Sequence, residues 1–310
     1  MATLSRFAVC VCAAAVTLLS CSGAQAPMGV QHPIPPSAAL EAMNGDLLYI
    51  SDPTFNDVYI YSYPALKPVG TLTGFNLPGG LCSDRLGNVF VADLLDRQIF
   101  EYGHGNSKRI ETLNVNGYPE GCSVDPSTGN LAVANYGSSG SPGDIAIFPH
   151  ARGTPAIYSD PTMISFTNCA YDESGNLFAD GQKYGNAPGL VELPNGGGAL
   201  KDLAFSRSFD AIGSVQWDGH YIVVGGNSRK SLYRLAISGS KVKVVGRTIL
   251  ESLGLPVSFW IEGKRILFTS YPPHSKYTAI GVWAYPNGDA PKKTIRQLPY
   301  VSGLTISLGR

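Results

Sequence analysis

The chain has 310 residues, of which 44% are hydrophobic and 15% are charged, so it can bury a large core. Its 23 basic and 23 acidic residues cancel, which excludes nucleic acid as the default partner because phosphate-binding proteins carry a positive surface. The 36 glycines, 22 prolines and 16 tyrosines are typical of many short strands separated by tight turns. The composition therefore predicts an all-β protein.

Residues 1–20 have the pattern of a secretory signal peptide, with Arg6 before an apolar run that is too short to span a bilayer. Two cleavage sites compete. One follows the small residues Ala24-Gln25-Ala26, and the other lies in Leu18-Leu19-Ser20-Cys21, which resembles the lipobox of bacterial lipoproteins. Pro27 directly after the first site disfavours an ordinary signal peptidase. We therefore favour lipid acylation of Cys21.

Residues 21–40 are polar, rich in alanine and interrupted by four prolines, which is typical of an extended tether. We expect a signal peptide at 1–20, this tether at 21–40 and a folded body at 41–310. The acyl chain would be the membrane attachment of an exported envelope protein, on the periplasmic or outer-membrane face. Ser22, where an aspartate would favour inner-membrane retention, permits the outer membrane.

An internal repeat follows the tether, in which a turn glycine precedes a short apolar strand. The turn glycines are Gly45, Gly87, Gly129, Gly175, Gly219 and Gly263, at intervals of 42, 42, 46, 44 and 44 residues. A period in the low forties with four short strands is typical of a β-propeller blade.

The end of the chain has the same phase as its beginning. A last apolar strand ends at Gly309, 46 residues after Gly263, where the next repeat would begin. Six intervals separate Gly45 from Gly309. The sequence therefore predicts a six-bladed β-propeller in which the C-terminal strand closes the first blade, so that neither end leaves a free strand edge.

The second repeat carries a more specific motif. Its Gly87-Asn88 turn, its apolar strand ending at Asp93 and the following Arg97 and Ile99 resemble an NHL repeat. The third and fourth repeats keep a polar residue at the strand end but lack the arginine. This resemblance implies the propeller fold more than an activity, because propellers include both binding modules and enzymes.

Enzymatic motifs are sparse. The five histidines lack metal-ligand spacing, and no phosphate-cradling loop or nucleophile elbow is present. Pro119-Glu120-Gly121 is similar to the start of an inner strand in SMP-30/gluconolactonase propellers, with Asn168 at a comparable place in the next repeat. That resemblance implies a divalent cation such as calcium at Glu120 and Asn168. The remaining repeats offer few oxygen ligands, so we expect no cofactor and keep a metal-dependent lactonase as the alternative.

Three cysteines fall in consecutive inner strands. Cys122 and Cys169 each lie three residues before a turn aspartate, and Cys82 lies two residues before one. An exported compartment would allow a disulfide. However, equivalent positions in neighbouring blades are usually too far apart for one, so we expect small buried side chains instead.

Recognition is expected on the loops that follow each second strand, because loops on a rigid scaffold carry function. The candidate ligand-binding residues are Asp52, Asp93, Asn135, Tyr136, Asp180 and Tyr271. Asp52, Asn135 and Asp180 could instead be turn residues that accept local backbone hydrogen bonds, and Asp93 together with Arg97 could pin the junction of strand and loop. The sequence favours a non-enzymatic scaffold for an unknown envelope protein, peptide or glycan.

Overall fold

The computed structural model describes residues 44–137, 141–205, 212–226, 231–251, 255–271 and 277–309. The predicted signal peptide, the tether and Cys21 lie outside these ranges. Within the described ranges no helix is long and apolar enough to cross a membrane. The described residues form strands, turns and loops apart from one short 3-10 helix, η1 (Pro149–Ala151).

The strands form six antiparallel four-stranded units in the described part of the chain, and we call each unit a blade. From the inside outward, blade 1 consists of β25 (Leu304–Ser307), β1 (Leu47–Asp52), β2 (Asp57–Ser62) and β3 (Pro68–Leu72). Blade 2 consists of β4 (Pro78–Ser83), β5 (Val89–Asp93), β6 (Gln98–Tyr102) and β7 (Arg109–Asn114). Blade 3 consists of β8 (Tyr118–Val124), β9 (Leu131–Tyr136), β10 (Ile145–Phe148) and β11 (Ala156–Tyr158).

In the same order, blade 4 consists of β12 (Met163–Tyr171), β13 (Leu177–Lys183), β14 (Pro188–Leu193) and β15 (Lys201–Asp202). Blade 5 consists of β17 (Ile212–Trp217), β18 (Ile222–Gly226), β19 (Ser231–Ser238) and β20 (Lys241–Leu250). Blade 6 consists of β21 (Leu255–Glu262), β22 (Arg265–Tyr271), β23 (Thr278–Ala284) and β24 (Gly288–Leu298). Blades 5 and 6 also join edge to edge, because β20 and β24 pair in parallel. The two-residue strand β16 (Ala204–Phe205) pairs with β20.

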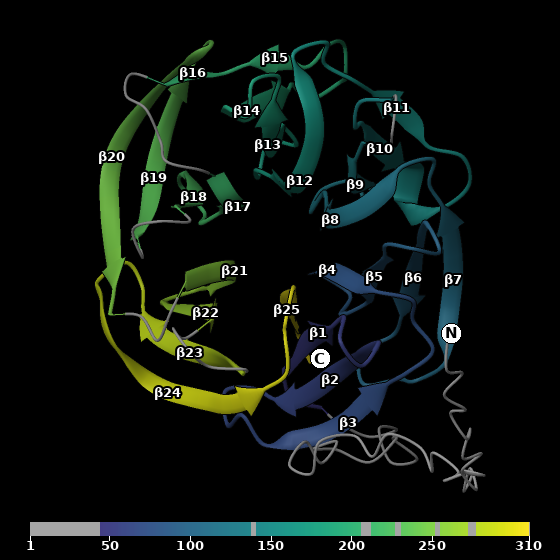
Figure 1. The fold of residues 1–310 in the computed structure, drawn as a ribbon, viewed down its shortest axis with the longest axis vertical. Helices are drawn as coiled ribbons and strands as arrows, with labels where there is room; N and C mark the ends of the chain where they lie inside the picture. The colour runs from purple at the N-terminus through teal and green to yellow at the C-terminus, as the bar shows by residue number, and fades with distance from the viewer. Residues whose placement is uncertain are drawn as a thin grey trace, which may run out of the picture. The chain divides into compact units, whose positions relative to one another are not determined.

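The inner strands β25, β4, β8, β12, β17 and β21 contact one another in this order around a central axis, and β21 contacts β25 again (Figure 1). Successive side chains of a strand point to opposite faces of its sheet. Each blade therefore packs one face on the preceding blade and the other on the following blade, and the core consists of six apolar clusters between blades. The predicted β-propeller is confirmed.

The predicted closure is also confirmed. The C-terminal strand β25 pairs antiparallel with β1, with Leu47 opposite Ser307 and Ile50 opposite Leu304. Leu304 and Ile306 are buried and pack with Leu267 of blade 6. Because β25 is the innermost strand of blade 1, it completes that blade and also contacts blades 2 and 6.

The recurring turn that defined the repeat has a local cause. Asp84 Oδ1 accepts hydrogen bonds from the backbone N–H groups of Leu86 and Asn88, both at 2.8 Å. Gly87 between them has φ of 86°, which glycine adopts without a steric penalty. Asp172 closes the equivalent turn of blade 4 in the same way. The motif is therefore a hairpin signature and carries no ligand chemistry.

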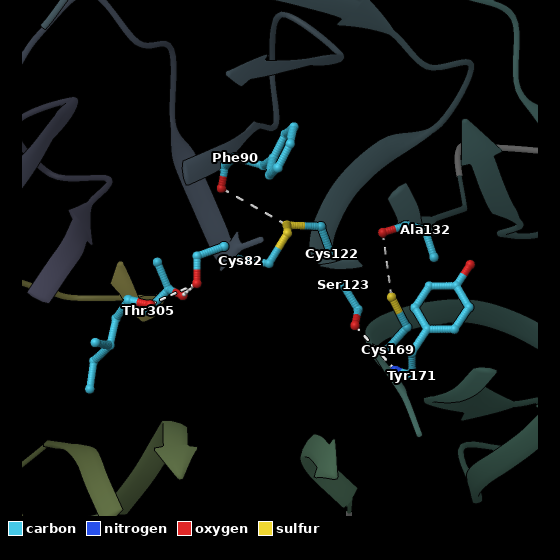
Figure 2. The surroundings of a disulfide bond; sticks show 10 residues. Cys82, Phe90, Cys122, Ser123, Ala132, Cys169, Tyr171 and Thr305 are labelled. Carbon is cyan, nitrogen blue, oxygen red and sulfur yellow. Dashed lines mark hydrogen bonds between the residues drawn. A yellow bond between two sulfur atoms is a disulfide. The ribbon is translucent and has the colours of Figure 1, made fainter. Parts of the chain in front are cut away.

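The expectation of unpaired cysteines is wrong, because Cys82 and Cys122 form a disulfide between blades 2 and 3 with their Cα atoms 5.6 Å apart (Figure 2). The two residues differ by one position relative to their turn aspartates. Because side chains alternate along a strand, Cys82 faces blade 3 while Cys122 faces blade 2, and both belong to one apolar cluster. Cys169 shares the offset of Cys122, faces the same way and remains a buried free thiol.

A glycine contact explains why the strands approach closely enough for this bond. A Cβ atom built on Gly80 of β4 would lie 2.8 Å from the Cα of Gly121 of β8. Any larger residue at position 80 would push the two inner strands apart. The short separation of the cysteines thus depends on a glycine two residues before Cys82.

Other junctions between blades use polar contacts at comparable levels of the inner strands. Thr305 Oγ1 of β25 lies 3.1 Å from Ser83 Oγ of β4. The backbone N–H of Tyr171 in β12 donates to Ser123 Oγ of β8 at 3.2 Å (Figure 2). The side chain of Gln216 in β17 bonds both the N–H and the carbonyl of Ile261 in β21. These contacts set the spacing of the blades near the axis.

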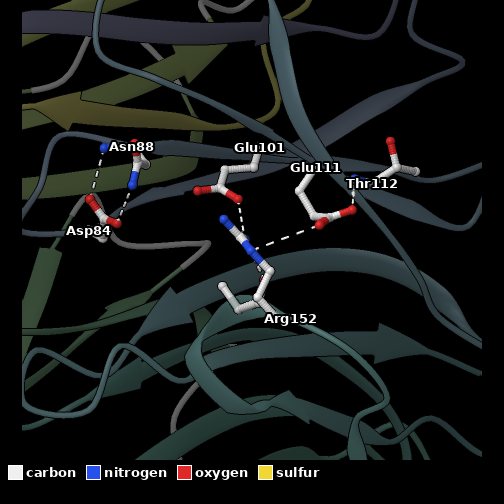
Figure 3. Close-up of polar contacts among 7 residues, drawn as sticks. Asp84, Asn88, Glu101, Glu111, Thr112 and Arg152 are labelled. Carbon is white, nitrogen blue, oxygen red and sulfur yellow. Dashed lines mark hydrogen bonds and ion pairs between the residues drawn. The ribbon is translucent and has the colours of Figure 1, made fainter.

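Blades 2 and 3 are also joined further out by ion pairs (Figure 3). Arg152, just after η1, pairs with the buried carboxylate of Glu101 in β6 and lies 3.9 Å from Glu111 in β7. The guanidinium provides the counter-charge that a buried carboxylate requires. The same two blades thus share a covalent bond near the axis and an ionic contact outside it.

The alternation of strands gives the propeller two ends. All inner strands begin, and all second strands end, at one end, which we call the loop face; the opposite end is the hairpin face. The described parts of the loop face include the turns 53–56 and 94–97, residues 137 and 141–144, the turn 184–187, and the linkers into β4, β8 and β25.

Candidate functional site

Asp52 and Asp93, two of the predicted ligand-binding residues, are completely buried. Asp52 Oδ1 accepts hydrogen bonds from the N–H groups of Thr54 (2.8 Å) and Phe55 (3.2 Å). Asp93 Oδ2 accepts one from Asn76 N–H at 2.7 Å, and burial raises the pKa of Asp93 to about 6. Asp52 is therefore the turn residue that the sequence offered as the alternative, whereas Asp93 binds the linker into β4 through Asn76.

Asn135 and Asp180 are likewise buried at the ends of their strands. The Asn135 amide donates to Asp144 Oδ1 at 2.6 Å. Asp180 Oδ1 accepts hydrogen bonds from Thr167 Oγ1 (2.9 Å) and from the N–H of Asn168 (2.8 Å). Burial raises the pKa of Asp180 to about 7. Asp180 therefore positions two residues of β12 and does not itself reach the surface.

The two tyrosines of the predicted set differ from these four residues. Tyr136 ends β9 with 41% of its surface exposed. Tyr271 ends β22, and its side chain lies outside the described residues. Of the predicted ligand-binding residues, Tyr136 is thus the one that the described structure places at the surface.

Exposed tyrosines recur on the loop face. Tyr184, between β13 and β14, is 63% exposed, and Tyr300, in the linker to β25, is 44% exposed. With Tyr136 they are the three most exposed tyrosines among the described residues. Arg97 lies over the ring of Tyr118, 4.6 Å from its centre, and donates to its hydroxyl at 3.0 Å. The loop face therefore carries aromatic side chains contributed by blades 3 and 4 and by the linker into blade 1, and aromatic residues are enriched at recognition surfaces.

A cavity of about 380 Å³ lies along the axis and is lined by residues of the inner strands and the linker to β25. Near the loop face five inner strands contain a register shift, where one or two residues have no partner on the second strand. These residues are Gly79 and Gly80, Glu120, Ile164 and Thr167, Gly213 and Ser214, and Val257 and Ser258. Such β-bulges redirect side chains and are frequent beside functional sites.

In blade 3 the bulge residue is Glu120, since Pro119 pairs with Asn135 and Gly121 pairs with Ala134. Its side chain lines the cavity, and burial raises its pKa. Asn168 of β12 lines the same cavity. The two residues singled out by the lactonase resemblance are thus both at the channel.

Glu120 and Asn168 do not form a site that could bind a divalent ion. Glu120 is the one carboxylate lining the cavity in the described ranges, and these ranges hold no group of three His, Cys, Asp or Glu residues able to bind a metal. Calcium takes six to eight oxygen ligands, and the neighbouring bulges supply glycine, threonine and serine. We therefore derive no metal-dependent step from this channel.

The sequence reasoning missed the aromatic lining of the channel. Trp217, the last residue of β17, and Trp260, in β21, both line the cavity and are partly buried, as does the exposed Tyr300. The one sequence feature that could have indicated this lining is that Trp217 and Trp260 fall in predicted inner strands. Which face of the strand each side chain uses depends on the bulges, which the repeat pattern does not reveal.

No protein-family model and no curated protein matches the chain. Solved structures resemble it: a protein of unknown function from Bacteroides caccae is 11% identical, covers 85% of this chain and 99% of its own, and has a TM-score of 0.63. A chain of the nidogen/laminin complex is 14% identical, with 86% and 100% covered and a TM-score of 0.67. Hydrazine synthase from Kuenenia stuttgartiensis is 14% identical, with 75% and 72% covered and a TM-score of 0.58. At such identities the likeness shows the fold alone: the chain is a β-propeller.

Proposed function

We propose that this protein is an exported, lipid-anchored binding scaffold whose loop face captures a protein, peptide or glycan of the cell envelope. The observation that carries the proposal is the placement of Tyr136, Tyr184 and Tyr300 on one end of a ring. Rigid aromatic side chains provide contact area with little loss of conformational entropy. The NHL-like second repeat agrees with a binding role.

Export is supported by the disulfide between Cys82 and Cys122. Disulfides form and persist in oxidising compartments and are rare in the cytosol. The pattern of residues 1–20 provides a route to such a compartment, and the lipobox-like run ending at Cys21 provides an anchor.

Substituting Tyr136, Tyr184 and Tyr300 together by serine is expected to weaken partner capture by at least about tenfold, because hot-spot aromatics each contribute about 2 kcal/mol or more. The measurement is crosslinking of purified protein to envelope extract and to a glycan array, with the retained partner quantified. The control is Leu86→Ser with Ile110→Ser, which removes two residues that are similarly exposed but lie away from the loop face. Equal capture by the tyrosine variant and the wild type would show that the loop face is not the recognition surface.

Cys21→Ala is expected to move the protein from the detergent-extracted membrane fraction to the soluble fraction, because acylation is the membrane attachment that we infer. Fractionation followed by immunoblotting measures the change, with Cys169→Ala as the matched cysteine control. If the Cys21→Ala protein stays in the membrane fraction, the lipid anchor is refuted, whatever the loop face binds.

A further inference from the structure

Glu120 has an environment that the loop-face proposal does not explain. Within the described residues its carboxylate has neither a hydrogen-bond donor nor a cationic partner. It nevertheless lines the axial cavity from a bulge of β8. A carboxylate that is partly withdrawn from bulk water without a counter-charge is destabilised, and a cationic ligand would relieve that cost.

The rest of the cavity lining is uncharged. No lysine, arginine or histidine contributes to it in the described ranges, so Glu120 makes the channel negative. The neutral lining combines hydroxyl and amide groups with the partly buried Trp217 and Trp260, each of which also packs against an apolar cluster between blades. Glu120 lies in the bulge near the start of β8, whereas Trp260 lies in the second half of β21 and Trp217 ends β17, so the tryptophans lie nearer the hairpin face.

From these observations we infer that the channel binds a small organic cation, with an ammonium group at Glu120 and an uncharged aromatic or aliphatic body extending toward Trp260 and Trp217. The volume of about 380 Å³ is within the range of small-molecule sites. An anion would be repelled by Glu120, and a metal ion would lack oxygen ligands. The channel shares Tyr300 with the loop face, but Glu120, Trp217 and Trp260 belong to the channel and not to the tyrosine set, so a test at Glu120 is distinct from the test of loop-face capture.

Three compounds with the same body and different head groups test the inference: 4-phenylbutylamine, 4-phenylbutan-1-ol and 4-phenylbutyrate. The readout is intrinsic fluorescence, because two of the three tryptophans line the channel while Trp283 is fully buried. The amine is expected to bind at least about tenfold more tightly than the alcohol, as for a hydrogen bond to a charged group, and the carboxylate to bind least.

Glu120→Gln keeps the size of the side chain and removes its charge, so the preference for amine over alcohol is expected to disappear. Glu173→Gln, at an exposed hairpin residue, is the matched control and should retain it. Burial raises the pKa of Glu120, so amine binding should weaken as the pH falls through that raised value, where the carboxyl becomes neutral. Thermal melts confirm that both variants are folded.

Three results would overturn the inference. The alcohol or the carboxylate could bind as well as the amine, Glu120→Gln could keep the preference for the amine, or none of the three compounds could alter the fluorescence. None of these results bears on capture by the loop face, which is measured with the tyrosine variant.

Discussion

Deletion of residues 301–310 is expected to abolish cooperative folding or to lower the free energy of unfolding by roughly 5 kcal/mol or more. The deletion removes β25 and with it Val301, Leu304 and Ile306, which are all buried. It also removes the backbone pairing with β1 and leaves an open edge at the centre of the ring. Urea denaturation followed by far-UV circular dichroism measures the loss.

Because the truncated protein could fail to accumulate, two further measurements accompany it. Deleting residues 309–310 alone keeps β25 and should leave the unfolding midpoint nearly unchanged. Ile306→Ala, at a side chain that is 1% exposed, should cost about 2–5 kcal/mol in a folded protein. If the long truncation melts at the wild-type temperature, the ring does not depend on β25 and the closure described here has no energetic role.

Replacing Cys82 and Cys122 together by serine is expected to lower the free energy of unfolding by about 2–4 kcal/mol. The bond closes a loop with a sequence separation of 40 residues, so its loss enlarges the conformational freedom of the unfolded chain. Both side chains are also buried between blades 2 and 3. Denaturation with and without reductant measures the effect.

The reductant provides the internal control for this prediction. It should destabilise the wild type by about the amount lost in the double variant and should leave the double variant unchanged. Cys169→Ala controls for removal of a buried thiol, because Cys169 forms no disulfide. An equal unfolding midpoint for the oxidised and reduced wild type would mean that the bond is absent in solution or adds nothing to stability.

The sequence by itself determined the strands, the repeat and the closure of the ring. In blades 2 to 5 the hairpin between the first two strands contains an aspartate and a glycine that act locally, as Asp84 and Gly87 show, so the repeat can be recognised without tertiary information. The final strand could be assigned to blade 1 because its distance from Gly263 equals one period. Turn residues and the length of the repeat therefore suffice to predict a fold that is built from similar units.

Tertiary structure alone decided which side chains meet and which reach solvent. The Cys82 and Cys122 side chains meet because they alternate to facing sides of two strands that glycines allow to approach closely. Asp52 and Asp180, which are polar and end apolar strands, are held below the surface by hydrogen bonds, from the N–H of Thr54 to Asp52 and from the hydroxyl of Thr167 in the paired strand β12 to Asp180. Glu120 turns to the axis through a bulge that is set by pairing with β9. The direction in which a side chain points and its burial depend on strand register and on the neighbouring blades. The sequence of a single repeat encodes neither the register nor the neighbours.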